Sequence, residues 1–467
     1  MEKMGSRADK LAMHHQQYLW AYWSLILAGI WMMLSPLTFQ YGLQASVPAG
    51  GREVWLSLPW RACWLSWSDW ITGALLIYFG WRSLVPDRPA SVWICCALGL
   101  WLSFAPLLFW APSAAAYLNG TFTGMLVIAF SILIPGMPNA MVHMQPGPDV
   151  PAGWSYNPSS WSQRWILILL GFGGMMTSRY LAAYQLGYIG SVWDPIFGEG
   201  SRRVLESRLS QSWPVSDAGL GAFSYTLEFL MGFMGGKMRW RTMPWMVTLF
   251  GILVIPLGLT HIFLVISQPL LVGSWCSFCL LAALFMLPMI PLEVDEVIAM
   301  SQFLARAKKN GRPFWATFWQ GGTEEGGGED QRSPELLLLP RQPWNLLRAS
   351  CWGMSHSATL WAMVALGAWL AFSPLMLGLE GSAANLDHVV GLLIIVFSVI
   401  AMGEVVRIGR YLNALIGLGL MAASLTLDSA TTLSRCNDVL IGAFILLLSY
   451  PRGPQKENYG AWNRFIR

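Results

Sequence analysis

Charged residues are scarce in this chain. Asp, Glu, Lys and Arg together make up 12% of its 467 residues, whereas hydrophobic residues make up 55%. The mean hydropathy is +0.48, which is too apolar for a soluble protein of this length. We therefore expect an all-α, multi-pass integral membrane protein, in contact with membrane lipid along its apolar helices.

Features of several other protein classes are also missing. The net charge of +4 is spread over short loops between apolar segments, so it predicts membrane orientation and gives no sign of a nucleic-acid partner. The N-terminal stretch MEKMGSRADK leads into an apolar segment with no small-residue cleavage site before the next loop. We therefore expect no cleavable signal peptide.

Twelve apolar segments are candidates to cross a membrane, which takes about 20 helical residues. If the N-terminus is cytoplasmic, almost every cluster of Lys and Arg lies on the cytoplasmic side, as the positive-inside rule requires. We predict about twelve transmembrane helices in a bacterial inner membrane, with both termini cytoplasmic. The segments centre near Ile30, Leu76, Leu100, Val127, Leu170, Leu227, Leu253, Ala282, Leu366, Ile395, Leu418 and Phe444.

A two-part pattern recurs along the chain. Residues 27–39, 97–109 and 365–377 share a small-residue turn, then Trp, then Ser-Pro or Ala-Pro, and a fourth copy is degenerate. Each copy is followed by a second apolar segment that opens with a polar residue and Gly. One repeat is thus a two-helix hairpin whose first helix ends at a Pro. Two hairpins precede the middle of the chain and two follow it.

These hairpins resemble the bacterial SPW repeat, a two-helix membrane unit named for its Ser-Pro-Trp signature. Few ionisable groups lie at membrane depth in them, so a packing scaffold is favoured over a binding site. His388 and Glu404 fall near predicted helix ends, and we expect both at the membrane interface.

Two cysteines stand three positions apart in the stretch GSWCSFCLL, at the edge of a long apolar run. Counting crossings places Cys276 and Cys279 at the periplasmic end of the eighth segment, where conditions are oxidising. At a helix N-terminus, backbone N–H groups stabilise a thiolate, and the spacing puts both sulfurs within disulfide reach. We expect Cys276 to be the more exposed sulfur and Cys279 to face the membrane interior.

Two other interpretations of this motif were weighed. Two small core cysteines are the main alternative to a redox pair. A zinc site needs four ligands, and no second CxxC or His pair lies on that side, so no metal is expected.

The helices around the motif resemble the vitamin K epoxide reductase family. The resemblance rests on a Val-Leu-x-Ser loop (VLES), an aromatic-Pro-Val segment before a Gly-rich helix (SWPVSDAGLG), and a last helix that opens with CxxC. It implies a four-helix bundle around a membrane quinone, either ubiquinone or menaquinone. By position, Cys279 matches the cysteine that reacts with quinone and Cys276 the one that exchanges disulfides. The implied function is a quinone-dependent oxidoreductase that oxidises periplasmic thiols.

The sequence departs from that family in the outside loop, which normally carries a second cysteine pair. Ser201 stands where the nearer cysteine is expected, and the upstream position falls near Pro195. Three explanations are open. A periplasmic thioredoxin-like protein or a small thiol exchanges directly with the CxxC pair; or Cys63 and Cys436, both in predicted outside loops, act as relay cysteines; or the chain is a non-catalytic scaffold or membrane-complex subunit.

Polar residues at membrane depth need an explanation. His261 and Tyr225 are candidates to hydrogen-bond a quinone carbonyl, and Glu228 is a candidate to relay a proton, although structural pairing explains such residues equally well. The charged loop at 194–206 is either a solvated cap over the bundle or a docking surface for a periplasmic partner.

A transporter, suggested by the repeats, is disfavoured because mid-membrane charges are scarce.

Composition divides the chain into five parts. The parts are two hairpins at 1–138, a cytoplasmic connector at 139–160, the four-helix domain at 161–305, a flexible cytoplasmic linker rich in Gly, Glu and Pro at 306–350, and two hairpins with a basic tail at 351–467.

Overall fold

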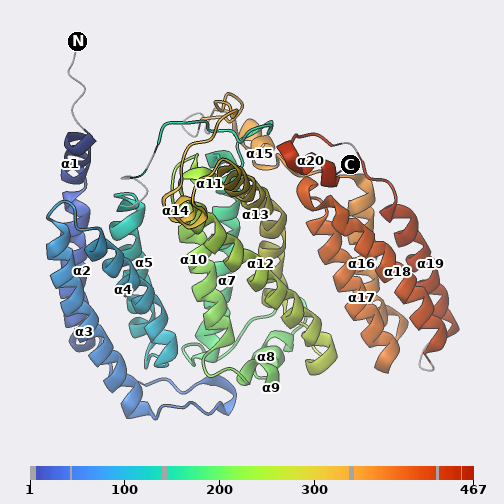
Figure 1. Ribbon diagram of the computed structural model, residues 1–467. Coiled ribbons are helices and arrows are strands. Elements are labelled where there is room, and N and C mark those ends of the chain that lie inside the picture. The colour runs from blue at the N-terminus through green and yellow to red at the C-terminus, as the bar shows by residue number, and fades with distance from the viewer. Residues whose placement is uncertain are drawn as a thin grey trace. The chain divides into compact units, whose positions relative to one another are not determined.

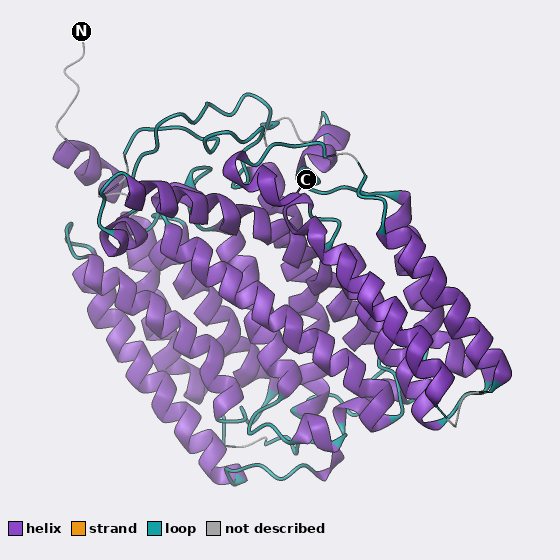
Figure 2. Ribbon diagram, turned by 45° about the vertical axis from the view of Figure 1, so that its right-hand side comes forward, coloured by secondary structure: helices purple, strands orange, loops and turns teal. Residues whose placement is uncertain are grey.

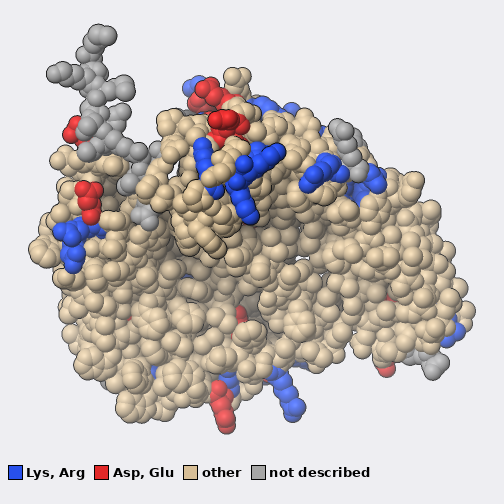
Figure 3. Space-filling view, viewed as in Figure 1, with Lys and Arg blue, Asp and Glu red and all other residues tan. Residues whose placement is uncertain are grey.

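Helices form nearly all of the regular structure, as the apolar composition predicted (Figure 2). The computed structural model describes residues 7–42, 45–138, 143, 145–335, 341–427, 431–453 and 455–466, and no strand occurs among them. Parts of the predicted connector and linker, at 139–142, 144 and 336–340, lie outside the described residues. Uncharged residues cover most of the face in Figure 3.

All twelve predicted segment centres lie in helices (Figure 1). Among the described residues, ten helices are long and apolar enough to cross a membrane. The other two predicted segments are α10 (Asp217–Phe233), which has 17 residues, and α3 (Leu58–Ser83), which carries three charged residues. A multi-pass membrane protein is confirmed, and the number twelve stays a prediction.

The chain forms two compact units. Unit 1 comprises residues 1–144 and 171–235, and unit 2 comprises residues 145–170 and 236–467. The boundary falls inside α7 (Trp161–Gln185), so the predicted four-helix region contributes residues to both units.

Unit 1 contains the first two hairpins together with α10 and the loop before it. The hairpin helices pack against one another in the order α2, α3, α4 and α5. Besides α3 and α10, its elements are α1 (Arg7–Gln17), α2 (Leu19–Thr38), η1 (Ala49–Gly51), α4 (Pro89–Leu108), α5 (Ala114–Ile128), η2 (Ala129–Leu133), α8 (Gly200–Leu205) and α9 (Arg208–Gln211).

Unit 2 contains the last two hairpins together with the helices on either side of the CxxC motif. Helix α17 packs against both α12 and α13, so the hairpins and the CxxC helices share one core. The elements are α11 (Arg239–Thr242), α12 (Pro244–Ser267), η3 (Gln268–Val272), α13 (Ser277–Lys309), α14 (Phe314–Gln320), α15 (Pro343–Ser350), α16 (Ala358–Leu377), α17 (Gly381–Ile400), η5 (Glu404–Gly409), α18 (Arg410–Thr426), α19 (Thr432–Ser449), η6 (Gly460–Trp462) and α20 (Asn463–Ile466).

A pair of facing glycines holds each hairpin together. A Cβ atom on any of the eight glycines would lie 2.5–3.0 Å from the carbonyl oxygen of its facing glycine, so only hydrogen fits there. Small residues at such crossings let two membrane helices approach closely. The degenerate fourth repeat keeps its pair, which makes this contact the common feature of the repeats. The pairs are Gly29–Gly73, Gly99–Gly124, Gly367–Gly391 and Gly417–Gly442.

The repeated proline lies in the last turn of the first helix of three hairpins. Each helix continues two or three residues past it, so the prediction that Pro ends the helix is confirmed with a small shift. In every case the proline carbonyl accepts an N–H from five residues later, which closes the helix end. These bonds join Pro36 to Tyr41 (3.4 Å), Pro106 to Ala111 (2.8 Å) and Pro374 to Leu379 (3.0 Å).

The signature tryptophan ties neighbouring hairpins together. In the N-terminal pair, Trp31 Nε1 donates to Asn119 Oδ1 at 2.6 Å. In the C-terminal pair, Trp369 Nε1 donates to Asn437 Oδ1 at 3.0 Å. Each donor belongs to the first hairpin, and each acceptor lies in the second turn of the second helix of the next hairpin. The same contact thus recurs in both pairs, which supports the packing role expected for the repeats.

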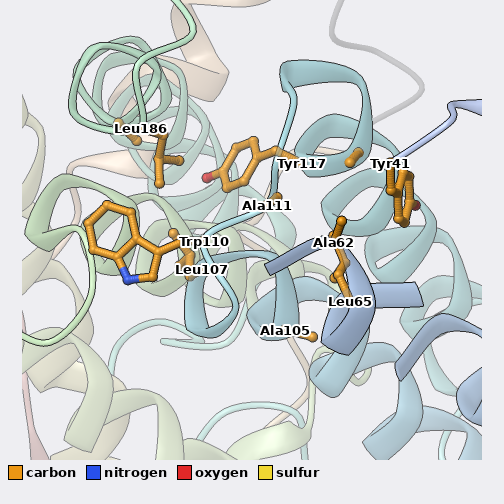
Figure 4. Packing of buried hydrophobic residues seen from close by; sticks show 11 residues of the cluster. Tyr41, Ala62, Leu65, Ala105, Leu107, Trp110, Ala111, Tyr117 and Leu186 are labelled. Atoms are coloured by element: carbon orange, nitrogen blue, oxygen red, sulfur yellow. The ribbon is translucent and has the colours of Figure 1, made fainter. Parts of the chain in front are cut away.

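A buried cluster closes one end of unit 1 (Figure 4). It includes Trp110, Tyr117 and Leu186, contributed by the first two hairpins and the end of α7. The buried guanidinium of Arg61 lies beside it and donates to the carbonyl oxygens of Trp110 (2.6 Å) and Ser46 (2.9 Å). This charge near the start of α3 is therefore bonded to backbone oxygens, which compensates for its burial.

Described residues of the predicted linker contact other parts of unit 2. Gly328 bridges to Val150 of the connector, and Glu324 forms an ion pair with Arg306 at the end of α13. The flexibility expected from the Gly- and Glu-rich composition stays a prediction.

Glu404 is buried within the protein. Its carboxylate accepts hydrogen bonds from Ser355 Oγ (2.5 Å), the Lys456 N–H (3.0 Å) and Tyr459 Oη (3.0 Å). The C-terminal tail supplies two of these donors, and the expected position at the membrane interface stays a prediction.

Candidate functional site

The CxxC pair forms a disulfide at the start of α13. Cys276 and Cys279 are bonded to each other, with their Cα atoms 5.2 Å apart. Cys276 is the N-cap residue of α13, and its sulfur accepts the Cys279 N–H at 3.0 Å. This N–H is one of the unpaired donors at a helix N-terminus, where negative charge is stabilised. The same donor would stabilise a Cys276 thiolate after reduction.

A buried glutamine shapes the loop before the disulfide. Gln268 begins η3, and its side-chain Oε1 accepts the Cys276 N–H at 2.9 Å. Gly273 has φ +66°, a left-handed conformation that favours glycine, and it turns the chain back toward Gln268. We did not predict this role, although a single amide in the apolar stretch VISQPLLVG is a signal for it.

Trp275, directly before the disulfide, packs against the C-terminal hairpins. Its ring lies 5.2 Å from the ring of Phe372 on α16 and 5.5 Å from the ring of His388 on α17. His388 is buried within the protein, and its Nδ1 donates to the Ala371 carbonyl at 2.6 Å. Its expected position at the membrane interface stays a prediction. The loop at 268–275, which we call the redox loop, therefore packs against the repeats that follow it.

The exposure of the two sulfurs differs from the expectation. Cys276 is 0% exposed, whereas Cys279 is partly exposed. The prediction placed Cys276 nearer water because it stands first in the helix. Its N–H is instead held by Gln268 within the loop, and Cys276 has no exposed surface that a thiol from solution can meet.

The other predicted site residues lie in both units. Tyr225 and Glu228 lie one turn apart on α10 in unit 1, and His261 lies on α12 in unit 2 with the cysteines. His261 Nδ1 donates to the Leu257 carbonyl at 3.1 Å. Tyr225 is fully buried against α7, where a Cβ on Gly174 would lie 2.3 Å from the tyrosine ring.

Glu228 is the most unusual of these residues. It is 0% exposed, and neither carboxyl oxygen has a hydrogen-bond partner among the described residues. An ionised carboxylate is strongly disfavoured in such surroundings, which favours the neutral, protonated form. A buried acid with unused hydrogen-bonding capacity is suited to bind a polar group or pass on a proton.

Ser201, at the expected cysteine position, is bonded to an aspartate. Its N–H and hydroxyl both donate to Asp194 Oδ2, at 3.0 and 2.6 Å. Asp194 Oδ1 accepts the N–H groups of Ile196 and Phe197, at 3.1 and 2.8 Å. Asp194, next to Pro195, is thus joined to Ser201 by hydrogen bonds, and these connect the two parts of the loop without a disulfide.

The rest of that loop is solvated. Arg202 forms exposed ion pairs with Glu199 and Glu206, each at 3.3 Å. Exposed pairs of this kind contribute little to stability, which fits the solvated-cap interpretation.

The two candidate relay cysteines lie in helices and not in outside loops as predicted. Cys63 is in the second turn of α3, whose start is set by Pro59, and Cys436 is in the second turn of α19, which Thr431 caps. Both are exposed and form no disulfide. The described chain contains no cluster of His, Cys, Asp and Glu arranged to hold a metal ion.

These observations define a class of protein before any family is considered: an all-helical, multi-pass membrane protein with a cysteine pair at a helix start. Family comparisons identify the parts. The vitamin K epoxide reductase family matches residues 165–294, and the SPW repeat domain matches residues 20–134 and 357–451. The chain therefore contains a vitamin K epoxide reductase domain flanked in sequence by SPW repeat domains, as the resemblance indicated. No curated protein and no solved structure matches the chain.

The vitamin K epoxide reductase match carries a functional implication in general terms. It supports a membrane thiol/quinone oxidoreductase function and links the domain to a quinone. The SPW matches account for the glycine-paired hairpins.

Proposed function

We propose that this protein is a quinone-dependent thiol/disulfide oxidoreductase of the bacterial inner membrane. Cys276 and Cys279 are the catalytic residues, and they oxidise thiols on the periplasmic side. The observation that carries the proposal is the disulfide at the N-terminus of α13, with a backbone N–H directed at Cys276 Sγ. A helix terminus of this kind stabilises the thiolate that thiol exchange requires.

The proposed reaction has two balanced halves. Two substrate thiols reduce the Cys276–Cys279 disulfide; their sulfurs form a new disulfide, and the enzyme gains a dithiol. The bound quinone, ubiquinone or menaquinone, accepts two electrons and two protons from that dithiol and becomes a quinol. Cys276, at the helix N-terminus, is the sulfur that exchanges with substrate. Cys279, partly exposed one turn further along α13, is the sulfur that reacts with the quinone.

Polar residues of the matched domain fit a quinone. Glu228 is a neutral acid with unused hydrogen-bonding capacity, which suits a proton donor to a quinone oxygen. Tyr225 is the proposed donor to a quinone carbonyl oxygen. Nδ1 of His261 already donates within its own helix, so Nε2 of the neutral ring is an acceptor, and the proposed role of His261 is to accept a hydrogen bond from a quinol hydroxyl.

The substrate thiols come from outside the chain in this proposal. Where family members carry their loop cysteines, this chain has hydrogen bonds between Asp194 and Ser201. A periplasmic thioredoxin-like protein or a small thiol therefore exchanges directly with the CxxC pair. The exposed and unbonded Cys63 and Cys436 are secondary candidates for a relay.

The alternative is a non-catalytic scaffold or a subunit of a membrane complex. The same Asp194–Ser201 contact favours it, because the loop has a structural closure in place of cysteines. In that case the CxxC disulfide only fastens the start of α13.

A reconstitution assay separates these functions. Purified protein in liposomes with quinone and a small dithiol should produce quinol at a rate proportional to protein. We expect Cys276→Ser or Cys279→Ser to lower the rate by about 100-fold or more, since covalent exchange is then impossible.

The matched control is Cys351→Ser. Cys351 is unbonded and lies just after α15, outside the CxxC loop, so this variant should keep the wild-type rate. Equal rates for all three variants would favour the scaffold.

A further inference from the structure

Three arginines line one small pocket at an end of the C-terminal hairpins. Arg407 lies in η5, Arg410 begins α18, and Arg452 follows α19. Helix α20 of the C-terminal tail packs against η5 and contributes Phe465 to the pocket (Figure 1). Positive charges that share a pocket repel one another, so negative charge nearby is needed to balance them.

The chain itself provides negative charge for one of the three arginines. Arg407 forms an ion pair with Glu404 at 3.3 Å. In the part of the chain that the structure describes, neither Arg410 nor Arg452 forms an ion pair. Arg452 Nε instead donates to the hydroxyl of Tyr411 at 2.7 Å. Two guanidinium groups at the pocket therefore have no carboxylate to balance them.

Arg410 is the buried member of this set. Its side chain is only 1% exposed, and Nη1 donates to the Pro451 carbonyl. The buried Nε has no hydrogen-bond partner among the described residues. A buried charge with an unused donor is costly, and an anion bound beside this guanidinium would lower that cost.

Packing of the repeats does not explain an arginine at this position. Arg410 lies seven residues before Gly417, the crossing glycine of its hairpin. The first helix of each of the other three hairpins has an uncharged, buried residue seven positions before its own crossing glycine. These residues are Tyr22, Val92 and Leu360. The charge is thus an addition specific to the fourth hairpin.

An exposed apolar stripe on α18 begins at the pocket. Ile408 lines the pocket, and Leu412 and Leu415 follow it at helical spacing; all three side chains are exposed. The segment Glu404–Thr426 is apolar and long enough to cross a membrane, so its start lies near the level of the lipid headgroups. A cationic pocket above an apolar stripe matches the two parts of a phospholipid, which are a phosphate and its acyl chains.

We propose that this arginine pocket binds the phosphate of an anionic phospholipid headgroup. Arg410 and Arg452 donate to the phosphate oxygens, as the planar guanidinium does in other phosphate sites, and the acyl chains lie along the apolar stripe. The bound headgroup joins Arg452, which follows the last hairpin, to the start of α18. The site goes beyond the redox function and does not depend on it.

Lipid titration tests the site. Protein freed of lipid in detergent is titrated with phosphatidylglycerol, and native mass spectrometry measures the affinity of the tightest site. Phosphatidylcholine, whose choline offsets the phosphate charge, should bind about 10-fold more weakly. Arg410→Gln should lower the affinity for phosphatidylglycerol by about 10-fold or more, because hydrogen bonds to a charged group are lost.

The matched control is Arg348→Gln. Arg348 is an exposed arginine on α15 outside the pocket, so this variant loses the same charge and should keep the wild-type affinity. Arg452→Gln covers the case in which the Arg410 variant misfolds, because the Arg452 side chain is exposed. It should lower the affinity by about 5-fold, the typical effect of one arginine near an anionic lipid surface.

Inorganic phosphate distinguishes a lipid from a free anion. At millimolar concentration it should not displace phosphatidylglycerol, since it makes no contact with the apolar stripe. Displacement would assign the pocket to a free anion and overturn the lipid proposal. Equal affinities of wild type, Arg410→Gln and Arg452→Gln for phosphatidylglycerol would also overturn it, as would equal affinities of the wild type for the two lipids.

Discussion

The reactivity of the disulfide depends on a few residues at the start of one helix. The sulfur of Cys276 accepts a helical N–H, its own N–H is held by Gln268, and Trp275 is packed between Phe372 and His388. The loop thus fixes the sulfur at the helix terminus and shields it from water. Pre-positioning of this kind favours exchange only with a thiol that can open the loop.

Gln268→Ala should destabilise the redox loop. The substitution leaves the buried Cys276 N–H without an acceptor, which costs about 1–3 kcal/mol. Thermal unfolding in detergent should show a lower Tm, and alkylation after mild reduction should label Cys276 faster than in wild type. Thr260→Ala, which removes an exposed hydroxyl bonded only to its own helix at Pro256, is the control and should change neither value. Unchanged Cys276 labelling in Gln268→Ala would contradict the role of the glutamine.

For single residues, the sequence predicts which reactive groups are present better than it predicts whether their side chains are buried. The CxxC spacing at a helix start predicted two sulfurs within disulfide reach, with packed core cysteines as the alternative, and the two sulfurs are bonded. The burial of Cys276, His388 and Glu404 was not predictable, because their covering groups come from other segments of the chain. Tyr459, for example, lies 55 residues beyond the Glu404 carboxylate that it contacts.

At the scale of the element, the hairpin depends on its glycine crossing. The facing glycines bring two backbones into contact, and the tryptophan of one hairpin then reaches the asparagine of the next. Close approach lets dispersion and polar contacts act between helices in lipid, where the hydrophobic effect does not drive association. The repeats are therefore rigid packing units.

Gly417→Ala should destabilise the fourth hairpin, whereas Gly419→Ala should not. A Cβ at Gly417 would lie 3.0 Å from the Gly442 carbonyl oxygen, whereas a Cβ at Gly419 meets nothing within 4 Å. Overpacking of this kind costs about 1–3 kcal/mol, and alanine elsewhere in a helix is favourable by up to about 1 kcal/mol. Denaturant titration in detergent measures both variants on the same helix. Equal stabilities would show that the crossing is looser than described.

The sequence predicted the hairpins but not their contacts. Long apolar segments and the repeated Pro located the helices, because both signals are local. The glycine pairs join residues 24 to 44 positions apart, and their pairing depends on how the two helices cross. The degenerate fourth repeat illustrates this, since it lost the tryptophan and proline and kept Gly417.

At the scale of the whole molecule, the C-terminal tail and the linker fasten the helix ends of unit 2. Arg332 of the linker forms an ion pair with Glu457 of the tail at 2.7 Å, and Ser155 of the connector donates to the same carboxylate. Burial alone would raise the pKa of Glu457, but these hydrogen bonds and the charge of Arg332 outweigh it and hold the pKa below its usual value.

This contact should weaken in acid. Because the pKa of Glu457 is lower in the folded state, its contribution is complete above the usual carboxyl pKa of 4.5 and is lost as the pH falls through the lowered value. The Tm difference between wild type and Glu457→Gln should therefore be constant near neutral pH and shrink on acidification. A difference that grows in acid would mean that the ion pair is not the stabilising contact.

The most direct test of the redox account is whether quinone re-forms the disulfide in the isolated protein. The protein is reduced, freed of reductant and kept without oxygen, and then given quinone, with thiols counted by alkylation and mass spectrometry. The account predicts that Cys276 and Cys279 become resistant to alkylation while one quinol forms per chain, and that Cys63 and Cys436 stay alkylatable. Persistent free thiols at Cys276 and Cys279, with no quinol formed, would contradict it.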